Sequence, residues 1–235
     1  MSRPAPSARS IGEVLVSSRP FDDYATQFAL SAHDLSGGPV LDCPGGAGDF
    51  GATVRSRGGR VVSVDPCYLC SPDELTVRVE AELDRVGSWT ASQPDRFSLD
   101  GHGVWQQMPA WRSSAARFLA DYAADRRDAT GHYVRSSLPR LPFADGAFSL
   151  ALSGFLLFTY PDHFDEEFHL RALTELLRVA ADVRVHPLND SSGSPYPHLD
   201  RLLARLRSQG VAGELLPVAG RSDRRDDLTL RLTRS

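Results

Sequence analysis

The stretch VLDCPGGAGDFGATVRSRGGRVVSVDP, residues 40–66, decides the fold of this chain. It holds two short apolar runs, and each run ends in an acid, Asp42 or Asp65. A glycine-rich turn and a segment of helical length lie between them. Because the runs are mostly apolar rather than alternating, they are typical of parallel strands that are covered on both faces. The stretch therefore predicts a strand–turn–helix–strand unit with an acid at the tip of each strand.

The turn after the first strand carries Gly45, Gly46 and Gly48. Glycine has no side chain to keep a ligand away from the backbone, and it permits the dihedral angles of a tight turn. Asp65, at the tip of the second strand, is placed to accept hydrogen bonds from the two hydroxyls of a ribose. Together these features predict a binding site for a cofactor that contains a nucleoside.

Two glycine patterns fit this turn. Gly46, Gly48 and Gly51 match G-x-G-x-x-G, and Asp65 follows at about the spacing found in dinucleotide sites. This first pattern predicts a nucleotide-dependent oxidoreductase. The pattern is short and the chain has 19 glycines, so such a match has low specificity.

The second pattern starts at Asp42 and resembles motif I of the class I S-adenosylmethionine-dependent methyltransferases, D-x-G-x-G-x-G. Pro44 stands in place of the first glycine, and Gly46 and Gly48 are the second and third. The charge of Asp42 favours this resemblance. A carboxylate would repel the pyrophosphate of a dinucleotide, whereas it suits the ammonium group of a methionine moiety.

Residues 141–158, LPFADGAFSLALSGFLLF, resemble the same family. The match is a loop followed by a fourth strand over 148–153, whose tip at Ser153 faces the reactive methyl group in the family. Two positions that are usually acidic in the family are serine here: Ser137, where the residue pairs with the adenine amine, and Ser149. These serines keep a third hypothesis open, a catalytically inactive protein that binds S-adenosylmethionine.

The resemblance implies S-adenosylmethionine as the cofactor and a set of residues that contact it. Asp65 is expected to bind the ribose and Asp42 the methionine amine, with Tyr24, on a helix over 21–31, near the methionine end. The full set of expected cofactor contacts is Tyr24, Asp42, Pro44, Gly45, Gly46, Gly48, Asp65, Pro66, Ser137 and Ser153.

In this family the protein mainly positions the substrates for in-line methyl transfer. Tyr160 and His163 follow the fourth strand and are side chains suited to proton transfer, so we predict a catalytic role for both. No D/N-P-P-Y/F motif, typical of enzymes that methylate nucleic-acid amines, follows this strand. The net charge is −4, without a basic cluster. We therefore expect a small-molecule methyl acceptor and no nucleic-acid partner.

The expected fold is a doubly wound α/β domain with a mostly parallel seven-stranded sheet whose last strand is antiparallel. It should occupy residues 21–235, after a flexible N-terminal tail over 1–20. Residues 66–130 are too long for a plain crossover between parallel strands. They predict a helical insertion after the second strand, with helices over 71–86 and 110–128.

The insertion contains Trp89, Trp105 and Trp111, which are all the tryptophans of the chain. It follows the second strand, so it should lie beside the strand tips where the cofactor site opens. Aromatic side chains near a cleft can form the wall of a pocket for an apolar or planar molecule. We therefore expect the insertion to act as a lid or wall for the methyl acceptor, with Trp105 as its main contact.

The three cysteines, Cys43, Cys67 and Cys70, predict small buried thiols rather than disulfides or metal ligands. Their number is odd, the N-terminus lacks the apolar run of a secretory signal, and no fourth ligand follows at a zinc-binding spacing. No apolar run approaches the length of a membrane span. We therefore expect a cytoplasmic protein with neither a metal nor a membrane partner.

Overall fold

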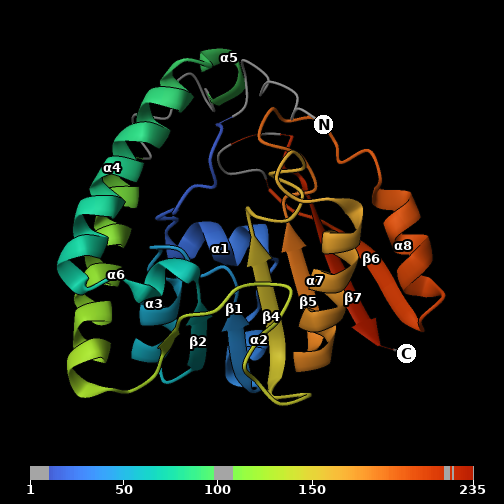
Figure 1. The fold of residues 1–235 in the computed structure, drawn as a ribbon, viewed down its shortest axis with the longest axis horizontal. Coiled ribbons are helices and arrows are strands. Elements are labelled where there is room, and N and C mark those ends of the chain that lie inside the picture. The colour runs from blue at the N-terminus through green and yellow to red at the C-terminus, as the bar shows by residue number, and fades with distance from the viewer. Residues whose placement is uncertain (1–10, 98–107, 220–222, 224, 235) are drawn as a thin grey trace.

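The computed structural model describes residues 11–97, 108–219, 223 and 225–234. In these residues, seven strands form one sheet in the order β3-β2-β1-β4-β5-β7-β6 (Figure 1). The strands are β1 (Pro39–Asp42), β2 (Arg60–Val64), β3 (Tyr133–Val134), β4 (Phe148–Gly154), β5 (Ala180–His186), β6 (Val211–Pro217) and β7 (Leu228–Arg234). β7 runs antiparallel to both β5 and β6, whereas the other pairs are parallel. The predicted fold class is confirmed.

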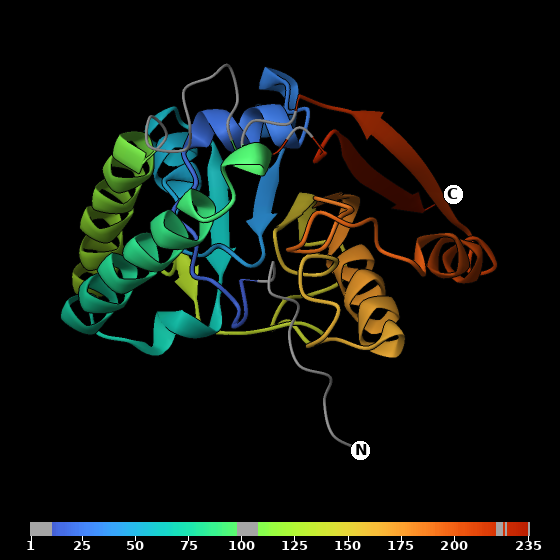
Figure 2. The ribbon, with the colours of Figure 1, turned by 90° about the horizontal axis from the view of Figure 1, so that it is seen from above.

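Helices cover both faces of the sheet (Figures 1 and 2). They are α1 (Phe21–Gln27), α2 (Ala32–Ser36), α3 (Phe50–Ser56), α4 (Pro72–Ala91), α5 (Pro94–Phe97), α6 (Met108–Asp128), α7 (Glu166–Val179) and α8 (Leu199–Arg207), with a 3-10 turn η1 (Pro66–Leu69). In β1, Leu41 packs in the core that contains α7, and Val40 packs in the core that contains α1 and α3. Alternate residues of a strand point to opposite faces, so both must be apolar here.

The insertion after β2 is a pair of long helices, α4 and α6, that lie side by side (Figure 1). Ser71 and Glu74 form a capping box at the start of α4, and Pro72 occupies its first turn. Leu75 and Leu83 of α4 pack with Phe118 of α6 in one core. The helix α4 continues to Ala91, beyond the predicted end at residue 86, because the single Gly87 that follows is tolerated inside the helix, where it is buried.

The predicted helix over 21–31 is shorter in the structure: α1 ends at Gln27, and a separate helix, α2, begins at Ala32, after the predicted range. Ala29, between them, has a left-handed φ of 49°. Ser31 starts α2 with its own capping box, in which it is paired with Asp34, and Asp34 is held by Arg184 of β5. The strong N-terminal signal of Ser31 thus begins a new helix rather than ending the old one.

Residues 11–20 differ from the predicted flexible tail. They form an extended segment in which Val16 and Ser18 are buried. The Ala47 backbone N–H, in the motif I turn, donates a hydrogen bond of 2.8 Å to the carbonyl of Ser17. Because this backbone pairing carries no side-chain pattern, the sequence gives no sign of it. We call residues 11–19 the N-terminal strap.

Candidate cofactor and acceptor cavities

A cavity of about 400 Å³ opens at the carboxyl ends of the central strands. Parallel α/β sheets bind ligands at this edge, and small-molecule sites typically have volumes of about 300–1,000 Å³. Its walls come from the N-terminal strap, the turn after β1, the tip of β2 with η1, the loop before β4 and the segment after β4. The lining residues are Val14–Ser17, Cys43, Pro44, Gly46, Val64–Cys67, Arg78, Ser136–Leu138, Gly154–Leu156, Phe164 and Phe168.

Asp65 lies on the wall of this cavity, at the tip of β2. One carboxylate oxygen accepts a hydrogen bond from the backbone N–H of Gly46 (3.1 Å), and the other accepts one from Cys67 (2.9 Å). The side chain therefore ties the motif I turn to η1. Each carboxylate oxygen can accept more than one hydrogen bond, so Asp65 keeps acceptor capacity for a ligand.

Asp42 lies beneath the cavity rather than on its wall. Its Oδ2 accepts a hydrogen bond from Ser63 Oγ at 3.5 Å, and the Tyr24 hydroxyl is a second hydrogen-bond partner of the carboxyl. Among the described residues, Oδ1 has no hydrogen-bond partner although it is buried. Burial, assisted by the charge of Asp65, raises the pKa of Asp42 to about 8. The group is therefore mostly protonated at neutral pH.

Gly45, Gly46 and Gly48, in the turn after β1, make room for other parts of the chain. A Cβ atom on Gly46, whose φ is +54°, would lie 2.8 Å from the carbonyl oxygen of Ser17. One on Gly48 would lie 2.6 Å from the carbonyl oxygen of Arg19, and one on Gly45 would lie 2.5 Å from the Tyr68 hydroxyl. These distances are too short for any side chain. Gly46 and Gly48 thus make room for the N-terminal strap, and of the three glycines only Gly46 lines the cavity.

Phe155, directly after β4, lines both this cavity and a second, smaller one of about 50 Å³. Its φ of 52° is left-handed, which is an outlier for a bulky residue. Strained backbone of this kind is concentrated at functional sites. The Arg19 guanidinium lies over the Phe155 ring, 3.3 Å from its centroid, and 4.7 Å from the centroid of Trp111. Phe155 and Arg19 therefore stand at the junction of the two cavities.

The second cavity combines aromatic walls with buried polar groups. Trp89, Phe97, Phe155 and Tyr160 contribute aromatic rings. Asp226 is 8% exposed, accepts a hydrogen bond from Asn189 at 3.1 Å, and has a pKa that burial raises to about 6. Thr159, also 8% exposed, has a hydroxyl with no hydrogen-bond partner in the described parts of the chain. Neither Asp226 nor Thr159 lies in a recognisable motif, so the sequence alone does not single them out.

The predicted cofactor contacts divide into two groups. Five of them line the larger cavity: Pro44, Gly46, Asp65, Pro66 and Ser137. The other five lie behind its wall: Tyr24, Asp42, Gly45, Gly48 and Ser153. Ser153 is 1% exposed, and its hydroxyl, like Asp42 Oδ1, lacks a partner among the residues described. The structure thus gathers the predicted residues around one cavity. Half of them line it, and the other half lie behind the residues that do.

The two predicted catalytic residues occupy different positions. The Tyr160 hydroxyl lines the smaller cavity and accepts a hydrogen bond from the backbone N–H of Leu15 at 3.0 Å. Burial raises the pKa of Tyr160, so the phenol stays protonated near neutral pH. His163 lines neither cavity; its Nε2 lies 3.9 Å from a carboxylate oxygen of Glu13. Both ring nitrogens of His163 are buried without a hydrogen-bond partner among the described residues, and its catalytic role stays a prediction.

The three tryptophans also separate. Trp105 lies outside the described residues, so the structure does not bear on its predicted role. Trp111 is part of the α4–α6 core, as tryptophans in helices usually are. Trp89 lines the smaller cavity beside Phe97, with ring centroids 5.0 Å apart. Of the two tryptophans that the structure describes, Trp89 is the one that lines a cavity.

All three cysteines are free, and burial raises the pKa of the Cys43 and Cys67 thiols. Cys43 and Cys67 are buried as predicted, while Cys70 is half-buried. Among the described residues, no group of His, Cys, Asp and Glu side chains is arranged to hold a metal ion. In the same residues, no helix combines the length and apolar character needed to cross a bilayer.

Comparison with known proteins gives distant similarities. No family model matches the chain. An uncharacterized protein of Methanocaldococcus jannaschii, MJ0045, is 24% identical over 207 residues, which are 85% of this chain and 89% of that protein. The glycopeptide N-methyltransferase MtfA aligns over 92% of this chain and 89% of its own, with a TM-score of 0.47 and 11% identity.

Two further solved structures show likenesses of the same order. A SAM-dependent methyltransferase from Aquifex aeolicus aligns over 85% of this chain and 82% of its own, with a TM-score of 0.40 and 15% identity. WbdD aligns over 91% of this chain, with a TM-score of 0.49 and 13% identity. This chain spans 39% of the WbdD chain.

The strand order of the sheet identifies the fold more clearly than any of these similarities does. Its order, β3-β2-β1-β4-β5-β7-β6, places β1 and β4 side by side at the centre, where the strand order reverses. The larger cavity lies at that reversal point, as expected for a doubly wound sheet. The antiparallel β7 between β5 and β6 closes the sheet. With this order, the chain has the fold of the class I S-adenosylmethionine-dependent methyltransferases.

Proposed function

We propose that the chain binds S-adenosylmethionine in the larger cavity and transfers its methyl group to a small molecule. One observation supports this most directly: Asp65 lies on the cavity wall at the tip of β2, with its carboxylate held by Gly46 and Cys67. This is the position from which an acid accepts hydrogen bonds from ribose hydroxyls. A dinucleotide fits less well, because β1 ends in an acid, Asp42, whereas a dinucleotide turn has a glycine directly after the strand.

The polar groups behind the wall fit the methionine end of this cofactor. Asp42 Oδ1 and Ser153 Oγ are buried without partners among the described residues. Buried polar atoms in folded proteins are nearly always hydrogen-bonded, so each of these two oxygens has an acceptor position left for a ligand or a water molecule. An ammonium group would supply donors and would favour the ionised form of Asp42. At the other end, Ser137 on the cavity wall is suited to the adenine base.

The smaller cavity is the proposed place of the methyl acceptor. It adjoins the larger one, since Phe155 and two residues of the N-terminal strap, Leu15 and Ser17, line both. A volume of about 50 Å³ admits only a small group. We therefore expect the reacting end of the acceptor, a hydroxyl or amine, to enter it while the rest of the molecule stays outside.

Asp226 is the group best placed to take the acceptor's proton. When bound, the cofactor would supply a methyl group attached to a sulfonium sulfur. The sulfur is the leaving group, and it departs as a neutral thioether. As the new bond forms to the acceptor oxygen or nitrogen, its proton passes to the Asp226 carboxylate. A general base works best when its pKa lies near the working pH, and a pKa of about 6 leaves Asp226 ionised at pH 7 and above. Tyr160 is less suited, because its pKa is raised and its hydroxyl is engaged by Leu15.

Turnover tests the activity. The purified protein is incubated with S-adenosylmethionine carrying a labelled methyl group and a panel of small hydroxyl and amine compounds. We expect S-adenosylhomocysteine to form together with a labelled product, and to form in smaller amount with the Asp226→Asn variant. Binding of the cofactor without S-adenosylhomocysteine formation across the panel would instead favour an inactive S-adenosylmethionine-binding protein.

A further inference from the structure

The N-terminal strap forms a wall shared by the two cavities. Val14–Ser17 line the larger cavity. Ile11, Leu15 and Ser17 line the smaller one. Apart from Phe155, the residues common to both cavities are Leu15 and Ser17. The position of the strap therefore determines the shape of both cavities at once.

One end of the N-terminal strap is fixed to the motif I turn. The Ser17 carbonyl accepts the hydrogen bond from Ala47 N–H, and Gly46 and Gly48 leave room for the strap backbone to pass. Figures 1 and 2 show the strap running between α4 on one side and α7 on the other. An extended segment of this kind has no internal hydrogen bonds, so its remaining backbone groups need partners on the elements that flank it.

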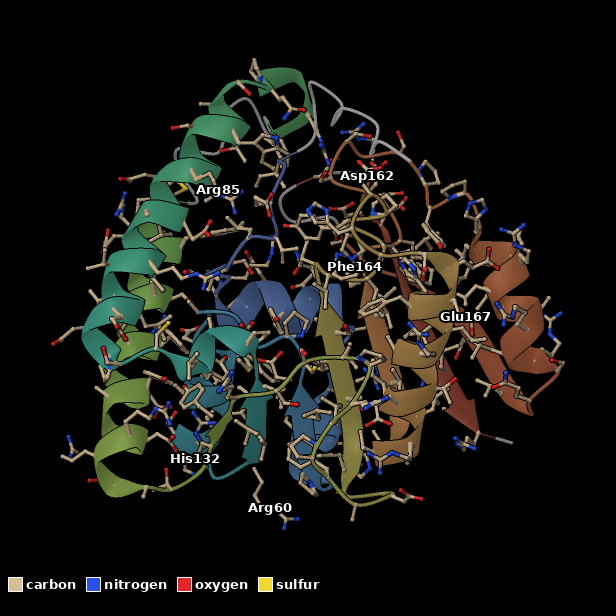
Figure 3. The ribbon with its side chains drawn as sticks, viewed as in Figure 1. Arg60, Arg85, His132, Asp162, Phe164 and Glu167 are labelled. Carbon is tan, nitrogen blue, oxygen red and sulfur yellow. The ribbon has the colours of Figure 1, made fainter. Side chains whose placement is uncertain are left out.

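Arg85 supplies partners from the side of α4. One guanidinium nitrogen donates to the carbonyl oxygens of Ile11 (3.2 Å) and Glu13 (3.0 Å), and the other donates to that of Val14 (3.4 Å). Glu82, one turn earlier on α4, accepts a 2.8 Å hydrogen bond from Nε and holds the guanidinium in place. Figure 3 shows Arg85 on α4, beside the strap. The planar guanidinium has five N–H donors spread over three nitrogens, so it can bind three carbonyl oxygens at once. The compact ammonium group of lysine is less suited to this.

Tyr160 supplies a partner from the opposite side. Its hydroxyl, on the segment between β4 and α7, accepts the hydrogen bond from Leu15 N–H at 3.0 Å. Tyr160 is 4% exposed, so the hydroxyl is fixed by its surroundings. Loss of this acceptor would leave the Leu15 N–H without its partner beside an apolar cavity, which disfavours the closed position of the strap.

We propose that Arg85 and Tyr160 are positioning residues for the cofactor, and that they act by holding the N-terminal strap between them as the wall of the cofactor cavity. This rests on the proposed function, since the larger cavity is taken as the S-adenosylmethionine site. It changes the role of the helical insertion. Through Arg85 on α4, the insertion contributes to cofactor binding, whereas the sequence analysis expected it to serve only the acceptor.

The test measures the affinity of S-adenosylhomocysteine by calorimetry for Arg85→Gln, Tyr160→Phe and the double variant. Each single variant should weaken binding by about tenfold, the effect of losing about 1.4 kcal/mol of hydrogen bonding. The double variant should be little weaker than the worse single one, because either loss already releases the strap. Two side chains that affected the site independently of each other would instead show additive effects. Arg85→Lys, which keeps a cationic donor, should recover part of the affinity.

Arg112→Gln is the matched control. Arg112, on α6, forms exposed ion pairs with Glu80 and Asp84 of α4, so the variant removes an arginine from the same helix pair without touching the strap. Its S-adenosylhomocysteine affinity should equal that of the wild type. Amide hydrogen exchange without ligand should be faster at Leu15 and Ala47 in the Arg85 and Tyr160 variants and unchanged in Arg112→Gln. Exchange of this kind reports local opening rather than global unfolding.

The outcomes separate the two proposals. If the wild type binds no S-adenosylhomocysteine, the proposed function fails and this inference fails with it. If the wild type binds and the folded Arg85→Gln and Tyr160→Phe variants bind equally well, only the role of the two residues is overturned. Additive losses in the double variant would also overturn it, because they would mean that the two side chains act separately.

Discussion

Gly46 and Ser17 are in direct backbone contact: a Cβ atom on Gly46 would lie 2.8 Å from the Ser17 carbonyl oxygen, which also accepts a 2.8 Å hydrogen bond from Ala47. The glycine of motif I is therefore required by the chain's own N-terminal strap. The same contact places the strap over the turn that is expected to carry the cofactor. The binding site and the N-terminal segment are, for this reason, a single structural unit.

Replacing Gly46 by alanine tests this contact. The variant should lose about 1–2 kcal/mol of stability from the left-handed φ alone, and more from the clash with Ser17. It should also weaken S-adenosylhomocysteine binding, because the strap cannot keep its position. Gly146→Ala is the control, since Gly146 has a similar φ of +64° and nothing within 4 Å of the added Cβ. Equal stability losses in urea unfolding of the two variants, with unchanged ligand affinity, would show that the contact has no role.

Replacing Asp65 by alanine should reduce both cofactor affinity and stability. The expected loss of affinity is about 1.5–3 kcal/mol, the range for hydrogen bonds to a charged group. Stability should fall as well, since the backbone N–H groups of Gly46 and Cys67 would lose their acceptor. Calorimetry and urea unfolding measure the two effects. Asp65→Asn, which keeps one acceptor oxygen, should be the milder change; unchanged affinity in both folded variants would place the ribose elsewhere.

Asp42 predicts a pH dependence of stability. Its pKa of about 8 in the folded protein lies above the unfolded value of about 3.9. Between these values the folded state holds a proton that the unfolded chain has released, so folding is favoured at low pH. The contribution of Asp42 is fully present below about pH 4 and is lost as the pH rises through 8. In urea unfolding from pH 5 to 9, the wild type should therefore lose stability relative to Asp42→Asn; parallel profiles would contradict the raised pKa.

The same group predicts a pH dependence of binding. The ammonium of S-adenosylhomocysteine prefers an ionised carboxylate, so binding at pH 7 should release a proton from Asp42. Calorimetry in two buffers of different ionisation enthalpy measures the number of protons released. The wild type should release more than Asp42→Asn does, and its affinity should rise between pH 6 and 8. An affinity independent of pH over this range would remove Asp42 from the methionine end of the site.

Asp226→Asn should separate binding from turnover. The side chain does not line the larger cavity, so S-adenosylhomocysteine affinity should stay within about twofold of the wild type. With an acceptor that the wild type methylates, the rate should fall by roughly a hundredfold or more, the usual contribution of a general base. The wild-type rate should decline below about pH 6, where the carboxylate becomes protonated. An unchanged rate would leave Asp226 as a structural residue of the loop before β7.

The elements that the sequence predicted well are those with local patterns. The apolar runs and acids of residues 40–66 predicted β1, α3 and β2, and Ser71, Pro72 and Glu74 predicted the start of α4. Five of the predicted cofactor contacts line the larger cavity, because strand tips of a parallel sheet meet at one edge.

The features that could not be predicted from the sequence depend on contacts between segments that lie far apart along the chain. The strap is bound mainly through its backbone carbonyls and N–H groups, which every residue has, so residues 11–19 carry no pattern. Arg85 looks like any solvent-exposed arginine of a helix until its carbonyl partners are known. Phe155 adopts a left-handed φ, although a phenylalanine, unlike a glycine or an asparagine, does not predict that conformation. Asp226 is brought to the smaller cavity by the loop between β6 and β7, far along the chain from β4.

A parallel thermal titration with S-adenosylhomocysteine and NADH tests the central claim most directly. A ligand present at a hundred times its dissociation constant adds about 2.7 kcal/mol to the stability of a protein that binds it in the folded state. We predict that S-adenosylhomocysteine raises the melting temperature in a saturable manner and that NADH leaves it unchanged. Stabilisation by NADH without stabilisation by S-adenosylhomocysteine would contradict the account and would assign the turn at Gly46 to a dinucleotide.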